Sequence, residues 1–97
     1  RIVAAFDPID VMLLPTYLHP TIQVGEWARY RPGKTLEKIV RWIAPCPPFN
    51  ATGQPAIAIP TGFDVNGLPI GVQLAGHPAA EATLLALAAE LEAAYPW

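Results

Sequence analysis

Serine is absent from this sequence of 97 residues, cysteine occurs once, and charged residues make up only 14% of the chain. Without serine, the chain itself supplies no seryl nucleophile. The lone cysteine, Cys46, excludes an internal disulfide and favours a reducing, cytoplasmic location. The net charge is -2, without a basic cluster, so nucleic-acid binding has no electrostatic patch to support it.

Long hydrophobic runs and metal-binding spacings are missing as well. No apolar stretch approaches the ~20 residues that span a bilayer, and the start has no signal-peptide pattern. We therefore expect no membrane partner. His19, Cys46 and His77 are too widely spaced to resemble a zinc motif, so we expect no metal site.

Apolar residues, by contrast, are plentiful at 53% of the chain. Typical soluble domains carry roughly 25% charged residues, and a domain of this size buries only about 60% of its unfolded surface. Some apolar side chains should then pack against polypeptide outside this chain. Because the sequence opens on Arg1 and its one methionine is Met12, we expect a processed or truncated piece of a longer protein.

The first half predicts one strand and one helix. Residues 10–15, a short apolar run stopped by proline, are typical of a strand buried on both faces of a sheet. Residues 1–6 can be the end of a helix, and residues 16–32 are predicted as loop. A helix over 35–43 follows, with Thr35 as its N-cap.

The second half predicts a hairpin and a final helix. We expect an irregular segment over 45–55, a strand over 56–60, a turn at 64–67 and a strand over 70–75. The Asn-Gly pair within the turn is a strong hairpin signal. A helix over 79–94 should then pack on the sheet through one apolar stripe: Leu84, Leu87, Ala88, Leu91 and Tyr95.

The glycines, prolines and strand residues of the second half occur in a long ordered block, comprising 49–60, 62–64, 67–74, Gly76, Pro78 and 81–85. This block resembles the C-terminal block of the amidase-signature family, and residues 6–7 and 10–16 resemble the family's preceding strand. The resemblance implies an α/β fold, a mixed sheet with flanking helices. Residues 1–97 would be the C-terminal part of a single domain whose catalytic part lies upstream.

The same resemblance implies an amidase as the parent enzyme, which hydrolyses a carboxylic amide to an acid plus ammonia or an amine, with no metal and no organic cofactor. The family uses a nucleophilic serine, a second serine in a cis peptide, and a lysine. This chain has no serine, and Lys34 and Lys38 match no catalytic position. We expect no catalytic residue here and no activity from the chain alone. Its partners would be the N-terminal catalytic part and a small-molecule amide, and association with further copies is left open.

A substrate-binding wall is implied by position within the family, where the helix and loop before the Phe-Asn pair face the substrate in two branches. Carried over, that points to Val40, Ile43, Cys46 and Pro47. All four are apolar or nearly so, which favours a hydrocarbon or aryl group. The same stripe could instead be ordinary core.

Two other functions remain open. The glutaminase subunit of a tRNA-dependent amidotransferase resembles this block too, but usually carries a glutamine-binding aspartate seven positions before the residue matching Asn50. Ile43 stands there, which favours an ordinary amidase. The other alternative is a free-standing binding module; an open reading frame that continues upstream into a Gly-Gly-Ser-Ser stretch would eliminate it.

Cysteine chemistry and the aromatic residues each have two interpretations. Cys46 with His19 or His77 could form a nucleophile–base pair, although a lone cysteine is more often a small buried hydrophobe. A set of aromatic residues, Trp27, Tyr30 and Trp42, could line a substrate entrance or a subunit contact, or could cover the sheet edge and the helix over 35–43.

Overall fold

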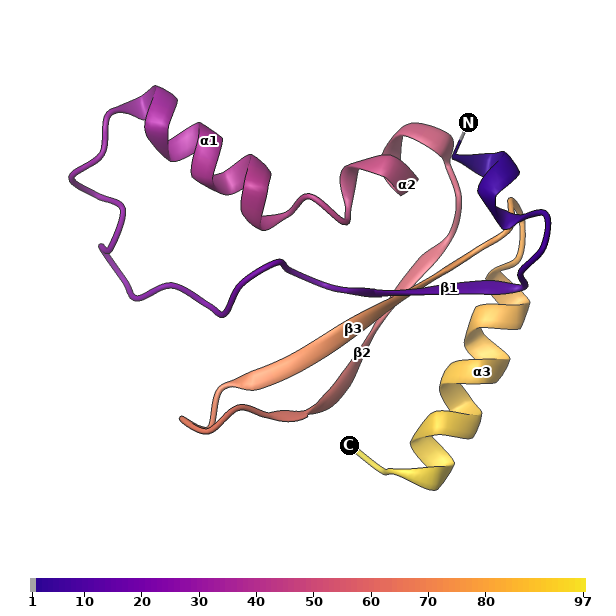
Figure 1. Ribbon diagram of the computed structural model, residues 1–97. Helices are drawn as coiled ribbons and strands as arrows, with labels where there is room; N and C mark the ends of the chain where they lie inside the picture. Colours follow the sequence, from indigo (N-terminus) through magenta and orange to yellow (C-terminus); the bar gives the residue numbers. More distant parts are fainter. Residues whose placement is uncertain (1) are drawn as a thin grey trace.

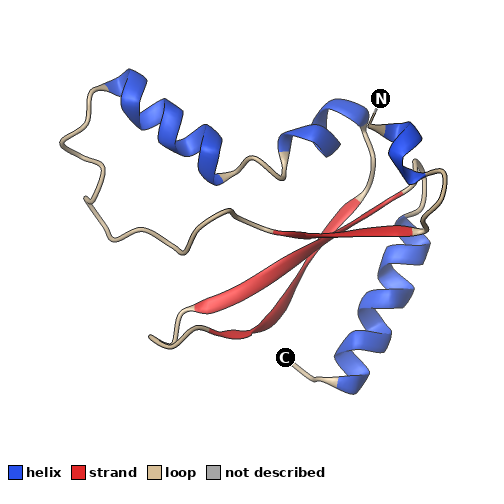
Figure 2. Ribbon diagram, in the orientation of Figure 1, coloured by secondary structure: helices blue, strands red, loops and turns tan. Residues whose placement is uncertain are grey.

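The computed structural model describes residues 2–97 as a small antiparallel sheet with helical segments on both of its faces (Figures 1 and 2). In chain order the elements are η1 (Val3–Phe6), β1 (Val11–Pro15), α1 (Pro32–Trp42), α2 (Pro47–Thr52), β2 (Ala56–Phe63), β3 (Pro69–Gly76) and α3 (Glu81–Ala94). The expected α/β class is therefore confirmed for this segment. Both strand pairings among these residues are antiparallel, so they contribute no parallel pair to a mixed sheet.

Strand β3 lies between β1 and β2 in the three-stranded sheet. Leu74 of β3 is in register with Leu13 on one side and with Ile57 on the other. The β2–β3 pairing shifts register between Pro60 and Gly62, where the strand bends. The side chains of β3 alternate between the two faces of the sheet, and the second half of the strand, residues 73–76, is buried.

Helix α3 covers one face. Leu84 and Ala88 pack there against Ile59 and Leu74, and Leu84 is only 2% exposed. The predicted stripe is thus confirmed for its first turns, with Leu87 partly buried. Its last members, Leu91 and Tyr95, are exposed among the described residues.

The opposite face holds a second core cluster, in which Phe6, Phe49 and Ala75 are buried together. The Phe6 and Phe49 rings meet edge to face, with centroids 6.3 Å apart. Phe49 lies in α2, a helix in the segment that the sequence predicted to be irregular. That expectation was wrong because Pro47 occupies the first turn, where proline favours a helix start, and Gly53 ends it with a left-handed φ of 69°.

Two other expectations need correction. Helix α1 begins at Pro32, with Arg31 as its N-cap, so Thr35 lies inside the helix and its hydroxyl donates to the Arg31 carbonyl. Here too a proline in the first turn outweighs a side-chain cap. Strand β1 is not buried on both faces: Leu13 shares a face with Leu74 but is 64% exposed, because α3 packs mainly over β2 and β3 and reaches β1 only at Val11.

The β2–β3 turn confirms the hairpin predicted from Asn66-Gly67. The Asp64 N–H donates to the Leu68 carbonyl over 2.8 Å, and Gly67 adopts a φ of 79°. The Asp64 carboxylate accepts from the backbone N–H groups of Leu68 and Asn66 over 2.9 and 2.8 Å. These hydrogen bonds, that from Leu68 foremost, hold the pKa of the Asp64 carboxyl below its usual value.

Truncation of the α3 anchor should destabilise the fold. Leu84→Ala removes a side chain buried between α3 and the sheet, and we expect a loss of about 2–5 kcal/mol in the free energy of unfolding. Leu85→Ala is the matched control, since Leu85 is 63% exposed and its truncation should change stability by no more than about 0.5 kcal/mol. Urea denaturation of both variants measures the difference. Equal losses would contradict this packing.

The turn carboxylate should make stability depend on acid pH. Since the folded pKa of Asp64 is lowered, its contribution is complete above the unfolded pKa of about 3.9 and is lost as pH falls through the lower folded pKa. Asp64→Asn keeps an acceptor but does not titrate. Wild type should therefore lose more stability than Asp64→Asn between about pH 5 and pH 2, as measured by denaturation at each pH. If the free energies of unfolding of wild type and Asp64→Asn followed the same pH profile, the stabilising role of the Asp64 carboxylate would be refuted. Asp64→Ala, which lacks the acceptor, should be less stable than Asp64→Asn at every pH.

Candidate functional site

The predicted substrate wall begins on α1. No other segment within residues 2–97 buries the apolar stripe of this helix. Val40 is 54% exposed, and Ile43, the C-cap residue of α1, is half-buried. Leu36 and Ile39 lie on the same stripe and are also exposed. Figure 1 shows α1 away from α3 and from the hairpin. The stripe is therefore available to whatever lies outside these residues, whether polypeptide or ligand.

The other two wall residues lie in and after the turn that joins α1 to α2. The Cys46 N–H donates to the Ile43 carbonyl over 2.9 Å, and the Phe49 N–H donates to the Cys46 carbonyl over 3.2 Å. Consecutive turns thus hold Ile43 and Cys46 together, while Pro47 is exposed at the start of α2. Substrate contact by the four residues stays a prediction.

The sulfur of Cys46 is directed towards the sheet. Its Sγ lies 3.7 Å from the Thr16 carbonyl oxygen and 3.8 Å from Oε1 of Gln73. The two histidines are engaged elsewhere: Nδ1 of His19 is 2.8 Å from the Pro20 carbonyl, and Nε2 of His77 is 2.8 Å from the Ile9 carbonyl. The geometry gives no support to a cysteine–histidine pair.

Within 2–97, no three histidine, cysteine or acidic side chains are grouped so that they could hold a metal ion. No helix in that range is long and apolar enough to cross a bilayer.

The aromatic residues of the long loop pack on α1. Trp42 of α1 stacks on His19 with centroids 5.4 Å apart, and its indole N–H donates to the His19 carbonyl over 3.0 Å. Trp27 meets Trp42 edge to face at 5.8 Å. The Lys38 ammonium lies 5.5 Å from the Trp27 ring centroid and 5.0 Å from that of Tyr30. The expected contact of this set with the helix is therefore observed, and the set fixes the loop against α1. A role as a substrate entrance or a subunit contact stays a prediction.

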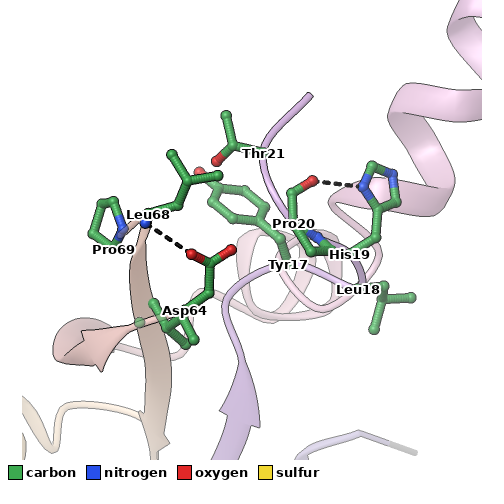
Figure 3. Close-up of a pocket in the computed structure, with 10 residues that line it drawn as sticks. Tyr17, Leu18, His19, Pro20, Thr21, Asp64, Leu68 and Pro69 are labelled. Carbon is green, nitrogen blue, oxygen red and sulfur yellow. Dashed lines mark hydrogen bonds between the residues drawn. The ribbon is translucent and has the colours of Figure 1, made fainter. Parts of the chain in front are cut away.

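A cleft that sequence reasoning missed lies between the start of this loop and the β2–β3 hairpin (Figure 3). It encloses about 240 Å³ and is lined by residues 17–21 and 68–71 with Asp64. In Figure 3, a dashed line joins the Leu68 N–H to the Asp64 carboxylate, and the Tyr17 side chain lines the same cleft. The cleft exists because β1 pairs antiparallel with β3, which brings the residues after Pro15 beside the start of β3. That long-range pairing leaves no local signal in the sequence.

Comparison with known proteins shows which family the chain resembles in sequence. The profile of the amidase family, described as "Amidase", matches residues 1–85. A protein of Synechocystis sp. named "Putative amidase" is 50% identical over 95% of this chain, and "Putative amidase AmiB2" of Mycobacterium tuberculosis is 43% identical over 100% of it. The chain covers 18% and 21% of these two relatives, so it spans about a fifth of their length.

Solved structures agree. The chain superposes on the structure of 6-aminohexanoate cyclic dimer hydrolase with a TM-score of 0.87 and 34% identity, covering 99% of this chain and 22% of that one. The same hydrolase with substrate bound gives a TM-score of 0.79 and 32% identity. Sequence and fold thus agree on one assignment: the chain belongs to the amidase family.

Proposed function

We propose that this chain is the C-terminal part of a single amidase domain that hydrolyses a carboxylic amide to an acid plus ammonia or an amine. The observation that carries the proposal is the fit to the solved 6-aminohexanoate cyclic dimer hydrolase over 99% of this chain and only 22% of that chain. One domain would then include residues 1–97 and an upstream segment, with the mixed sheet completed by strands of that segment.

The catalytic groups would lie in the upstream segment. A serine–serine–lysine triad needs a neutral lysine that accepts a proton through the bridging serine, and the present chain has no serine. Its two lysines are also engaged: Lys34 pairs with Glu37 over 2.8 Å, and Lys38 lies over the Trp27 and Tyr30 rings. The backbone groups that hold an oxyanion would likewise come from the upstream segment.

The upstream catalytic part would be the main partner of this chain. Ile39 on α1 and Leu91 on α3 are exposed apolar side chains. Burial of apolar area stabilises by about 25 cal/mol per Å², so contact with the remainder of the domain would stabilise both parts. We infer that the whole enzyme works in the cytoplasm on a small-molecule amide, without metal or cofactor.

Val40, Ile43, Cys46 and Pro47 would form one wall of the substrate site. The exposed α1 stripe supports this, because it presents hydrocarbon side chains and no charge beside the turn at 43–46. The wall suits a hydrocarbon or aryl group on the amide. Ile43 in place of an aspartate disfavours glutamine as the substrate.

The chain alone should release no ammonia from amides. Incubation of the purified chain with a panel of small aliphatic and aromatic amides should give only the buffer rate, because the nucleophile is absent. The full-length enzyme, assayed in parallel, should turn over at least one of them. If the purified chain released ammonia and kept this activity after repurification, the proposal that the catalytic groups lie in the upstream segment would be disproved.

A charge in the wall should weaken catalysis on hydrophobic amides. In the full-length enzyme, Ile43→Asp would place a carboxylate without a partner beside an apolar group, so kcat/KM for hydrophobic amides should fall while the fold is kept. Leu36→Asp is the matched control on the same stripe, two turns away from Ile43. It should leave the ratio of kcat/KM between hydrophobic and small polar amides unchanged. A folded Ile43→Asp enzyme with that ratio intact would remove Ile43 from the wall.

A further inference from the structure

Two glutamines are buried in the structure although glutamine is ordinarily a surface residue: Gln54 is 6% and Gln73 is 8% exposed. Gln73 lies in the middle of β3, opposite Leu14 and Ala58. Its neighbours on the same face of β3 are Gly71 and Ala75, so it is the one long side chain in that row. A buried amide requires hydrogen-bond partners, and these partners identify the segment of the chain that the side chain positions.

Both ends of the Gln73 amide reach the turn between α1 and α2. Its Nε2 donates to the Pro45 carbonyl over 3.4 Å, and its Oε1 accepts from the Cys46 thiol over 3.8 Å. Adjacent residues of the turn are thus held by one side chain of the central strand. Gln54 has the same chemistry elsewhere: its Nε2 donates to the Gly76 carbonyl over 2.8 Å, and its Oε1 accepts from the Thr52 hydroxyl over 3.0 Å.

Gly71, two residues before Gln73 on the same face of β3, has closely packed surroundings. A Cβ added at Gly71 would lie 3.2 Å from the Ile59 carbonyl oxygen and 3.4 Å from Oγ1 of Thr16. The Thr16 carbonyl, in turn, faces the Cys46 sulfur at 3.7 Å. The end of β1, the row on β3 and the turn therefore fit together at Cys46.

We propose that Gln73 is a positioning residue for substrate selection: it fixes the 43–46 turn and, through it, the Ile43 and Cys46 side chains. This inference rests on the proposed function, which places those two side chains in the substrate wall. Gln73 touches no reacting atom. An apolar residue of similar size would fill its space, but the Pro45 carbonyl would lose the Gln73 donor and the Cys46 thiol would keep only the Thr16 carbonyl as an acceptor.

The test compares Gln73→Met with Gln54→Met in the full-length enzyme. Both replacements remove one buried amide of similar shape, so both should lower stability. Only Gln73→Met should change selectivity, measured as the ratio of kcat/KM for a bulky and a small aliphatic amide. We expect a change on the order of tenfold, because a misplacement of about 1 Å can lower a rate about a hundredfold.

A second readout does not depend on catalysis. The alkylation rate of Cys46 by iodoacetamide, followed on its peptide by mass spectrometry, should rise several-fold in Gln73→Met and stay near wild type in Gln54→Met. Gln73→Glu keeps an acceptor for the thiol but replaces the donor to Pro45 by a carboxylate oxygen that repels the Pro45 carbonyl, and should change both readouts at least as much as Gln73→Met.

Folded Gln73→Met enzyme with unchanged selectivity and unchanged labelling would overturn the inference, as would equal changes in Gln54→Met. If Gln73→Met does not fold, Gln73→Glu carries the same two measurements, and wild-type values there overturn it equally. A wild-type enzyme that hydrolyses no amide would refute the proposed function instead. In that case faster labelling in Gln73→Met would still show that Gln73 holds the turn.

Discussion

Antiparallel pairing on both edges of β3 is the constraint on which the other contacts depend. It brings together β1 from the start of the chain and β2 from its middle. It also divides the side chains of β3 between two environments. Leu74 meets α3 on one face, whereas Ala75 meets the phenylalanines of the second cluster on the other. The position of α2, and of the turn before it, follows from this division.

Short sequence patterns were sufficient to predict the elements that short-range interactions determine. The Asn66-Gly67 turn, the alternation along β3 and the periodicity of α3 all appear in short windows of sequence. The helix starts at Pro32 and Pro47 could also have been predicted from the preference of proline for the first turn. The exposure of Leu13 could not, since an apolar run looks the same at the edge of a sheet as at its centre.

Candidate site residues divide in the same way. The α1 stripe with Val40 and Ile43 is visible as a helical pattern, and the resemblance to a family suggested its use. The contact of Gln73 with Cys46 joins two segments with no shared pattern and needs the folded chain. The cleft beside Asp64 likewise depends on the alignment of β1 with β3. Periodicity identifies which side chains share a face of one element, but it does not specify what that face meets.

The pairing of β1 with β3 also bears on how the chain reaches its fold. Val11 is in register with Gly76, whereas β2 and β3 are joined by a tight turn. Closing a long loop loses more chain entropy than closing a short one, and non-local pairing slows folding. The β2–β3 hairpin should therefore form early and β1 should join late. The last step of folding would then be the one that encloses Thr16 beside Cys46 and shapes the cleft.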